Sequence, residues 1–195
     1  LLEAFAPAHS IWRMPEGAAP LVYLTFDDGP NPAATPDLLD VLREALATAR
    51  LDSRDVAGIG LVTQRGSALA WDARTLRPLA PAQSWQDQRT AERVAGFRAL
   101  GIPINTLATA TKLEWWLAHD EAVKTAAREK RLRFGTPDVW LAARLSGGAL
   151  HVTDPGNASC TALFDVAGGE WAQGLLDLFK VPRESLPEIV PTSGV

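Results

Sequence analysis

The sequence has few of the features that mark a secreted, membrane-spanning or nucleic-acid-binding protein. It holds a single cysteine, Cys160, which excludes an internal disulfide and is typical of a reducing compartment. No apolar run approaches the roughly 20 residues that a membrane helix needs. The net charge of −4 and the pI of about 5.4 leave no basic excess for a nucleic acid. From these absences we expect a cytoplasmic protein that binds neither membrane nor nucleic acid.

What the chain does have is the composition of a soluble domain of ordinary size. Its 195 residues are 47% hydrophobic and 22% charged, which is enough for one domain with a real core. The N-terminus lacks an initiator methionine and a basic flank, so we interpret it as cut from a longer protein and not as a signal peptide.

Apolar runs and helical spacings alternate along the chain, which predicts an α/β fold with a mixed sheet flanked by helices. The expected strands cover residues 21–26, 56–63, 68–71, 78–84 and 149–153. Two expected helices start at Thr35 and at Pro137. Four others cover residues 87–100, 111–117, 121–130 and 171–179. In the helix that starts at Pro137, we expect the inward side chains to be Val139, Trp140, Leu141 and Leu145. Further tryptophans at helical spacing are assigned to the core, namely Trp115, Trp116 and Trp171.

Polar groups follow the predicted strand at 56–63. Gln64 and Arg65 stand at its end, and the run Trp85-Gln86-Asp87-Gln88-Arg89 follows the next hairpin. A guanidinium can donate two hydrogen bonds to neighbouring oxygens, and an indole can cover C–H faces. Forked donors, an aromatic plate and a carboxylate together suit a small polyhydroxylated ligand.

From about residue 43 to the end, the chain resembles the N-terminal, substrate-side domain of the FGGY carbohydrate kinases, and within them the glycerol-kinase branch. The resemblance is carried by motifs in the family's order: IGLVTQR (59–65), WDARTLRPL (71–79), WQDQRT (85–90), TATKLEWWL (109–117), FGTPDVWLAARLSGG (134–148), HVTDPGNASCTALFD (151–165) and LLDLFKVPRESLPEIVPTSGV (175–195). It implies part of an actin-like, ribonuclease-H-like domain, with the sugar or polyol bound in the cleft between two such domains.

The resemblance assigns the substrate-binding role to five residues, which are Gln64, Arg65, Trp85, Asp87 and Lys112. Other interpretations stay open for three of them. Trp85 also fits a core or surface-packing residue. Asp87 also fits the N-cap of the helix that follows, and Lys112 fits a solvated or structural charge.

Two positions depart from the glycerol-kinase pattern. Those enzymes usually have Arg-Glu at the strand end, where this chain has Arg65-Gly66, and a tyrosine where this chain has Leu107. Because both missing residues contact glycerol in the family, the resemblance does not fix the acceptor sugar or polyol.

The resemblance also implies ATP and Mg²⁺ for the complete enzyme, but it places their sites outside this sequence. The family's Asp-x-Gly-Thr phosphate loop, its Gly-Asp-Gln catalytic aspartate and its second domain are absent here. We therefore expect no catalytic residue, no metal and no confidently bound cofactor in this chain. We expect it alone to lack kinase turnover, and to associate with a second kinase domain or as a homo-oligomer.

Residues 12–42 resemble the first motif of the polysaccharide deacetylases, with TFDDGP at 25–30. In that family, the residue that matches Asp27 is the general base and the one that matches Asp28 binds a metal with two histidines. The partner His-x-x-x-His motif is missing, so a turn that ends a strand explains these residues better. We divide the chain into a deacetylase-like segment, 1–42, and a kinase-like domain, 43–195. The alternatives to a kinase are a deacetylase remnant and a non-catalytic module that binds a polyol or a partner.

Two further residues are assigned to structure. We expect His151 to stabilise the strand that it opens and Cys160 to be a small buried thiol.

Overall fold

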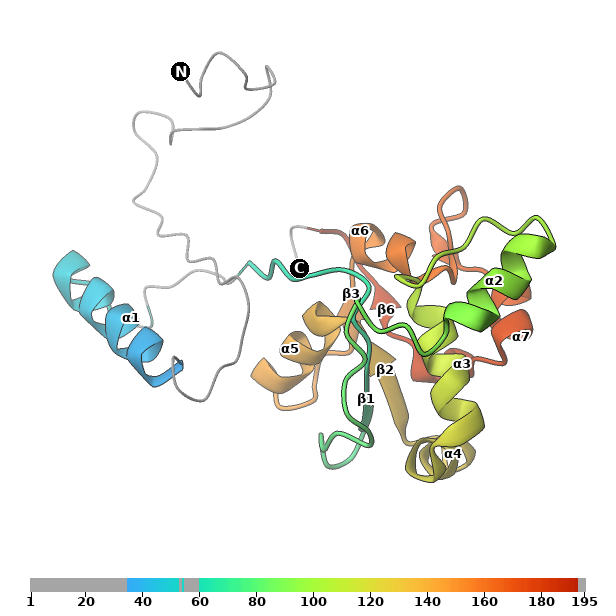
Figure 1. The fold of residues 1–195 in the computed structure, drawn as a ribbon. Coiled ribbons are helices and arrows are strands. Elements are labelled where there is room, and N and C mark those ends of the chain that lie inside the picture. Colours follow the sequence, from blue (N-terminus) through green and yellow to red (C-terminus); the bar gives the residue numbers. More distant parts are fainter. Residues whose placement is uncertain (1–34, 53, 55–59, 193–195) are drawn as a thin grey trace, which may run out of the picture. The chain divides into compact units, whose positions relative to one another are not determined.

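The structure is a computed structural model that describes residues 35–52, 54 and 60–192 (Figure 1). The chain divides into two units, residues 1–60 and 61–195. In the first unit, helix α1 (Thr35–Ala49) starts at the residue that the sequence predicts. Proline at the second position of a helix suits this start, because its missing N–H has no partner there in any case. The predicted strand 21–26 and the residues Asp27 and Asp28 lie outside the described residues.

The second unit is built around an antiparallel strand pair. Strand β1 (Leu69–Asp72) pairs with β2 (Leu132–Gly135), with Leu69 opposite Gly135 and Asp72 opposite Leu132. Figure 1 shows the helices arranged around these strands. They are α2 (Ala91–Ala99), α3 (Thr109–His119), α4 (Glu121–Arg128), α5 (Pro137–Leu145), α6 (Pro155–Ala158) and α7 (Gln173–Phe179).

Short strands complete the second unit. Strand β3 (Val152–Thr153) runs parallel to β6 (Glu188–Ile189), and β4 (Phe164–Asp165) runs antiparallel to β5 (Glu170–Trp171). Two short 3-10 helices, η3 (Ser159–Thr161) and η4 (Arg183–Ser185), join these elements. The described residues thus form a mixed α/β domain. None of their helices is long and apolar enough to cross a membrane.

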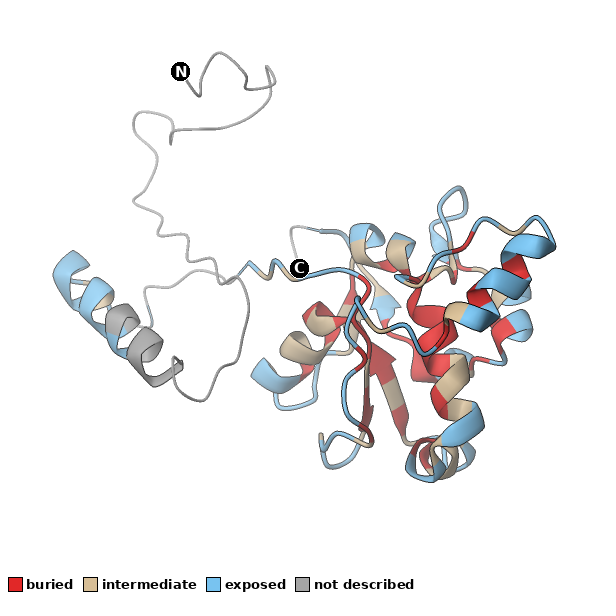
Figure 2. Cartoon of the chain, in the orientation of Figure 1, coloured by how far each residue is buried: buried red, intermediate tan, exposed pale blue. Residues whose placement is uncertain are grey.

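The main core lies between α3, the β1–β2 pair and the C-terminal helices, where buried residues gather in Figure 2. Trp116 on α3 meets Phe134 on β2 edge to face, with ring centroids 6.5 Å apart. Phe97 on α2 packs against Phe179 on α7 at 5.1 Å. Segments from both ends of the second unit therefore share one core.

A smaller cluster joins the other face of β1 to α5. Trp71 packs against Trp140 at 5.1 Å and against the ring of His151 at 5.5 Å. The Nε2 of His151 lies 3.2 Å from the carbonyl oxygen of Phe134, to which it donates. Burial lowers the pKa of His151 to about 4. The structural role predicted for His151 is confirmed.

The predicted pattern of burial is only partly right. Trp116 and Trp171 are buried as predicted, but Leu145 is 64% exposed, so its predicted inward position is wrong. Leu145 is the last residue of α5, where the helix has passed the end of the cluster around Trp71. Trp115 and Trp140 are only half-buried.

The predicted strands differ more from the structure. Strand β2 was not predicted, and the expected strand 78–84 contributes only two isolated bridges, from Pro78 to Trp71 and from Gln83 to Ala68. Residues 60–63 form no strand, and the rest of the predicted strand, 56–59, lies outside the described residues. The predicted loop 154–161 instead contains α6 and η3, because the Asp154 carboxylate caps α6 by accepting from the amide of Asn157 at 2.8 Å.

Candidate functional site

Three segments of the second unit meet at Gly66. Its backbone has φ +79°, and a Cβ built there would lie 2.9 Å from the carbonyl oxygen of Leu107. On the other side, the amide N–H of Trp85 donates to Ser67 Oγ at 3.0 Å. The end of the predicted strand is therefore in contact with residues near 85 and near 107.

The guanidinium of Arg65 lies at this junction and is exposed, as is the side chain of Gln64. Among the described residues, its polar contact is the Cys160 sulfur, 4.0 Å from Nη1, and no carboxylate pairs with it. Cys160 is half-buried, so the prediction of a fully buried thiol is wrong. Its place in η3, beside Arg65, gives it partial access to solvent. The Arg65 donors thus remain available for a ligand.

Two large apolar side chains of the junction segments are exposed. Trp85 and Leu107 are each 42% exposed, and their backbones contact Ser67 and Gly66. Trp85 is therefore not a core residue. The exposed indole of Trp85 offers an apolar face for C–H groups. The exposed guanidinium of Arg65 offers hydrogen-bond donors for oxygen.

Asp87 is held by its neighbour Arg89. The two side chains form a salt bridge of 2.8 Å, and the Arg89 Nε–H donates to Asp87 at 2.9 Å. This hydrogen bond lowers the pKa of the Asp87 carboxyl, which keeps it ionised. Helix α2 starts at Ala91 with Thr90 as its N-cap, so the interpretation of Asp87 as an N-cap is wrong.

Lys112 lies behind this surface, with none of its area exposed. Its Nζ donates to the carbonyl oxygen of Thr106 at 2.6 Å. Burial lowers the pKa of Lys112 to about 8, and the negative charge of Asp87 opposes that change. Lys112 is therefore not a solvated charge. Its interactions join the segments that carry Thr106 and Asp87.

Three buried polar atoms lack a hydrogen-bond partner in the described part of the chain, and all flank the junction. They are Thr63 Oγ1, Gln83 Oε1 and Thr109 Oγ1. Each stands two residues from an exposed side chain of the junction, namely Arg65, Trp85 or Leu107. Buried polar atoms are nearly always partnered, so each of these three atoms is open to a hydrogen bond from a polar ligand or water.

Sequence reasoning missed Gln83 and Thr109. Gln83 is fully buried, its backbone pairs with Ala68, and its side-chain amide donates to the Lys112 carbonyl oxygen at 3.4 Å. A glutamine that follows the apolar run 79–82 was the available signal, because such a residue must find polar partners once buried.

The described residues offer no metal centre. No group of three or more histidine, cysteine, aspartate or glutamate side chains there could hold a metal ion. Asp27 and Asp28, for which a base role and a metal-binding role are considered above, lie outside the described residues.

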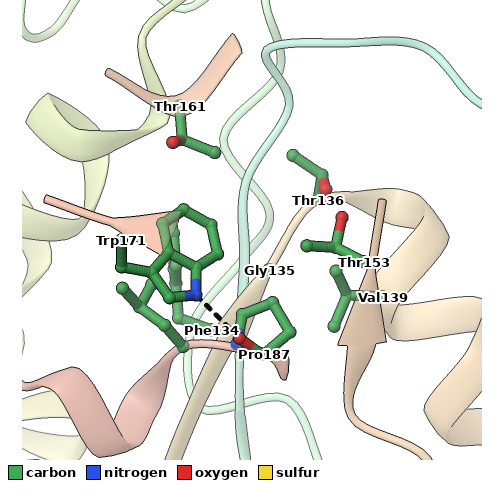
Figure 3. A pocket seen from close by; sticks show the side chains of 9 residues that line it. Phe134, Gly135, Thr136, Val139, Thr153, Thr161, Trp171 and Pro187 are labelled. Atoms are coloured by element: carbon green, nitrogen blue, oxygen red, sulfur yellow. Dashed lines mark hydrogen bonds between the residues drawn. The ribbon is translucent and has the colours of Figure 1, made fainter. Parts of the chain in front are cut away.

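A small hollow lies between β2, α5 and the C-terminal segment (Figure 3). It is lined by Phe134, Gly135, Thr136, Val139, Thr153, Thr161, Trp171, Leu186 and Pro187. The polar groups here are used within the chain, since the Trp171 indole donates to the Pro187 carbonyl oxygen at 2.8 Å and Thr153 donates to Asp138 at 2.8 Å. This hollow is part of the packing and not a second ligand site.

Comparison with known proteins identifies the class to which this fold and site belong. The family model described as the FGGY family of carbohydrate kinases, N-terminal domain, matches residues 35–195. The chain belongs to this family.

Within the family, the most similar relatives include glycerol kinases. That of Methylorubrum populi is 45% identical over 168 residues, covering 80% of this chain and 34% of the relative. That of Aromatoleum aromaticum is 43% identical over 166 residues, with the same coverage. This chain thus spans about a third of the length of the curated relatives that it matches.

Solved structures confirm the predicted fold class, part of an actin-like, ribonuclease-H-like kinase domain. The glycerol kinase of Plasmodium falciparum, solved with ADP, aligns with a TM-score of 0.70 at 25% identity, over 85% of this chain and 37% of that chain. A ligand-bound xylulose kinase of Lactobacillus acidophilus aligns with a TM-score of 0.61 at 24% identity, over 80% of this chain and 33% of that one, which supports the fold alone.

Proposed function

We propose that this chain is the acceptor-binding side of a carbohydrate or polyol kinase of the glycerol-kinase type. In the complete enzyme, which we assign to the cytoplasm, ATP and Mg²⁺ supply the phosphoryl group and its charge stabilisation. This chain's own part is to bind and orient the alcohol.

The observation that carries the proposal is the junction at Gly66. Exposed Arg65, Trp85 and Leu107 share it with three buried polar atoms that lack partners. Arg65 donates to two neighbouring hydroxyls, and Trp85 covers the carbon chain between them. A site of this kind also rejects analogues that lack a hydroxyl, because its polar groups would be left unpaired.

Three other residues complete the proposed site. Gln64 adds an exposed amide, and the ionised Asp87 accepts from a hydroxyl on its side of the junction. Lys112 acts from behind the surface, through the groups it holds. This arrangement orients the acceptor without itself supplying a base for the transfer.

The acceptor's identity depends on Gly66 and Leu107. A side chain at position 66 would collide with the Leu107 carbonyl, so this side of the site offers apolar Leu107 and no carboxylate. We therefore propose an acceptor class of small sugars and polyols that is wider than glycerol.

Binding tests the acceptor role directly. We expect the indole N–H signal of Trp85 and the amide signals of Gln64 and Arg65 to shift on titration with glycerol, xylitol and xylulose. Arg65→Ala weakens this binding. Arg77→Ala, an exposed arginine in the β1 hairpin, is the matched control and leaves binding unchanged. Absence of a shift with every sugar and polyol contradicts the proposal.

A coupled assay with ATP separates binding from turnover. We expect no steady product formation from this chain alone with the same acceptors. Adding the C-terminal domain of a glycerol kinase tests association, by gel filtration and by recovered activity. Steady turnover by the chain alone would show that it contains a phosphate site and a base that this proposal leaves to the complete enzyme.

A further inference from the structure

Lys112 links two of the segments that meet at the candidate site. Its ammonium donates to the Thr106 carbonyl oxygen at 2.6 Å, and its charge interacts with that of Asp87. Thr106 precedes Leu107, and Asp87 follows Trp85 by two residues. A single buried group therefore holds the backbone beside one exposed apolar side chain, Leu107.

The turn that Lys112 holds has support from its own residues as well. The amide of Leu107 donates to Asn105 Oδ1 at 2.9 Å, and the amide of Ala108 donates to the Asn105 carbonyl oxygen at 3.1 Å. These bonds fix the shape of the turn 105–108, and the Lys112 bond fixes its place against α3. Its placement matters at Gly66, because the Leu107 carbonyl oxygen lies 2.9 Å from the position that a Cβ would take.

Stability alone does not explain a lysine at this position. The side chain is fully buried, and burial disfavours its charged form. An unbranched apolar residue such as methionine would fill a similar volume without that cost. A charge kept in an unfavourable place indicates a role in the site that it adjoins.

We propose that Lys112 is a positioning residue of the acceptor site, whose buried ammonium holds the turn 105–108 so that Leu107, Trp85 and Arg65 form one binding surface. The proposal rests on the function proposed above. It assigns no contact between Lys112 and the acceptor.

Asp87 acts on Lys112 only through its charge, because no ion pair within 4.0 Å joins the two side chains. Asp87 is in turn held by Arg89. On the helices packed against α3, the charged groups have other neighbours: Lys124 pairs with Glu121 at 2.7 Å on α4, and Asp177 accepts from Gln173 at 2.8 Å on α7. Arg128 on α4 donates to Thr125 at 2.9 Å, and Cys160 in η3 lies by Arg65.

Substitution with matched controls separates positioning from simple stabilisation. We expect Lys112→Met to bind glycerol about tenfold more weakly while its unfolding midpoint in urea stays the same or rises. Lys112→Arg keeps the charge and recovers part of the affinity. Lys124→Met, which removes a charge from α4, leaves affinity unchanged. Unchanged affinity in Lys112→Met overturns the proposal, and so does a loss of folding, which would make the ammonium a stability element.

A second measurement is independent of any ligand. In the wild-type chain, the amide signals of Leu107, Ala108 and Asp87 should shift together with a midpoint near pH 8, where Lys112 loses its proton. The same signals should stay level in Lys112→Met. If no sugar or polyol binds, the proposed function fails but this titration still decides the positioning role. Signals that do not respond in the wild type overturn it.

Discussion

Two glycines differ in whether the surrounding structure leaves room for a Cβ atom. Gly66 has φ +79°, and a Cβ there would lie 2.9 Å from the Leu107 carbonyl oxygen. Gly96 stands within α2, and a Cβ there would meet nothing within 4 Å. The first glycine is required by its surroundings, whereas the second only weakens its helix.

We expect Gly66→Ala to lower the free energy of unfolding by about 2 kcal/mol, from left-handed backbone strain and the contact with Leu107. Gly96→Ala should raise it by about 1 kcal/mol, since alanine favours a helix interior. Urea unfolding of both variants measures the difference. A Gly66→Ala variant as stable as the wild type would show that the turn 105–108 moves freely.

His151 gives the stability a defined pH dependence. Its pKa is about 4 in the folded chain against 6.5 as the ordinary value, because burial disfavours the charged ring. Above pH 6.5 the ring is neutral in both states and its full contribution is present. As the pH falls from 6.5 to 4, the unfolded chain takes up the proton first, so stability is lost.

The expected loss from His151 across that range is about 3 kcal/mol. His151→Gln keeps a donor for the Phe134 carbonyl but cannot titrate, so its unfolding free energy should depend less on pH in this window. His119→Gln is the control, since His119 is exposed at the end of α3. Equal pH slopes for the wild type and His151→Gln would refute the assignment.

At the scale of elements, helix α4 depends on a cap at its first turn. The Asp120 carboxylate accepts from the amide of Val123 at 3.0 Å, and Val123 is fully buried against α3. We expect Asp120→Ala to lower the unfolding free energy by about 1 kcal/mol. Glu121→Ala removes only a surface ion pair with Lys124 and should leave the unfolding free energy nearly unchanged. Thermal unfolding measures the midpoints of the two variants. Equal midpoints would show that the Asp120 cap does not stabilise α4.

Helices were easier to predict than strands for a physical reason. Each helix carries its periodicity and its end signals locally, as Thr136-Pro137 does for α5. Strand β2 has only four residues, and its pairing with β1 joins positions some 60 residues apart. The pattern of Leu132-Arg133-Phe134 alternates, but such a short run is shared by many loops.

The sequence predicts the residue types of the candidate site, but it does not predict which of its residues are buried or lack hydrogen-bond partners. The motif around Trp85 and Asp87 predicts the binding chemistry, and in the structure the Trp85 backbone amide is bonded to Ser67, two residues after Arg65. Packing between segments far apart in sequence buries Lys112. The same packing leaves polar atoms of Gln83 and Thr109 without a partner. No local pattern reports such packing.

At the scale of the whole molecule, the second unit carries its own core. The residues of the main hydrophobic cluster that the structure describes all lie between Ala68 and Ile189. We expect a chain of residues 61–195 to unfold cooperatively, with a midpoint within about 2 °C of that of the 195-residue chain. Circular dichroism during heating checks this. A large drop in the midpoint would mean that residues 1–60 contribute to the core.

The contact between Gly66 and Leu107 also constrains how this protein can change over generations. A mutation that introduces a carboxylate at position 66 is harmful unless the turn at 107 has already shifted, and a shift at 107 alone gains nothing. The two positions are thus epistatic, so a lineage must alter them jointly to acquire a different acceptor preference. Libraries that randomise both sites at once should yield variants that stepwise mutagenesis never reaches.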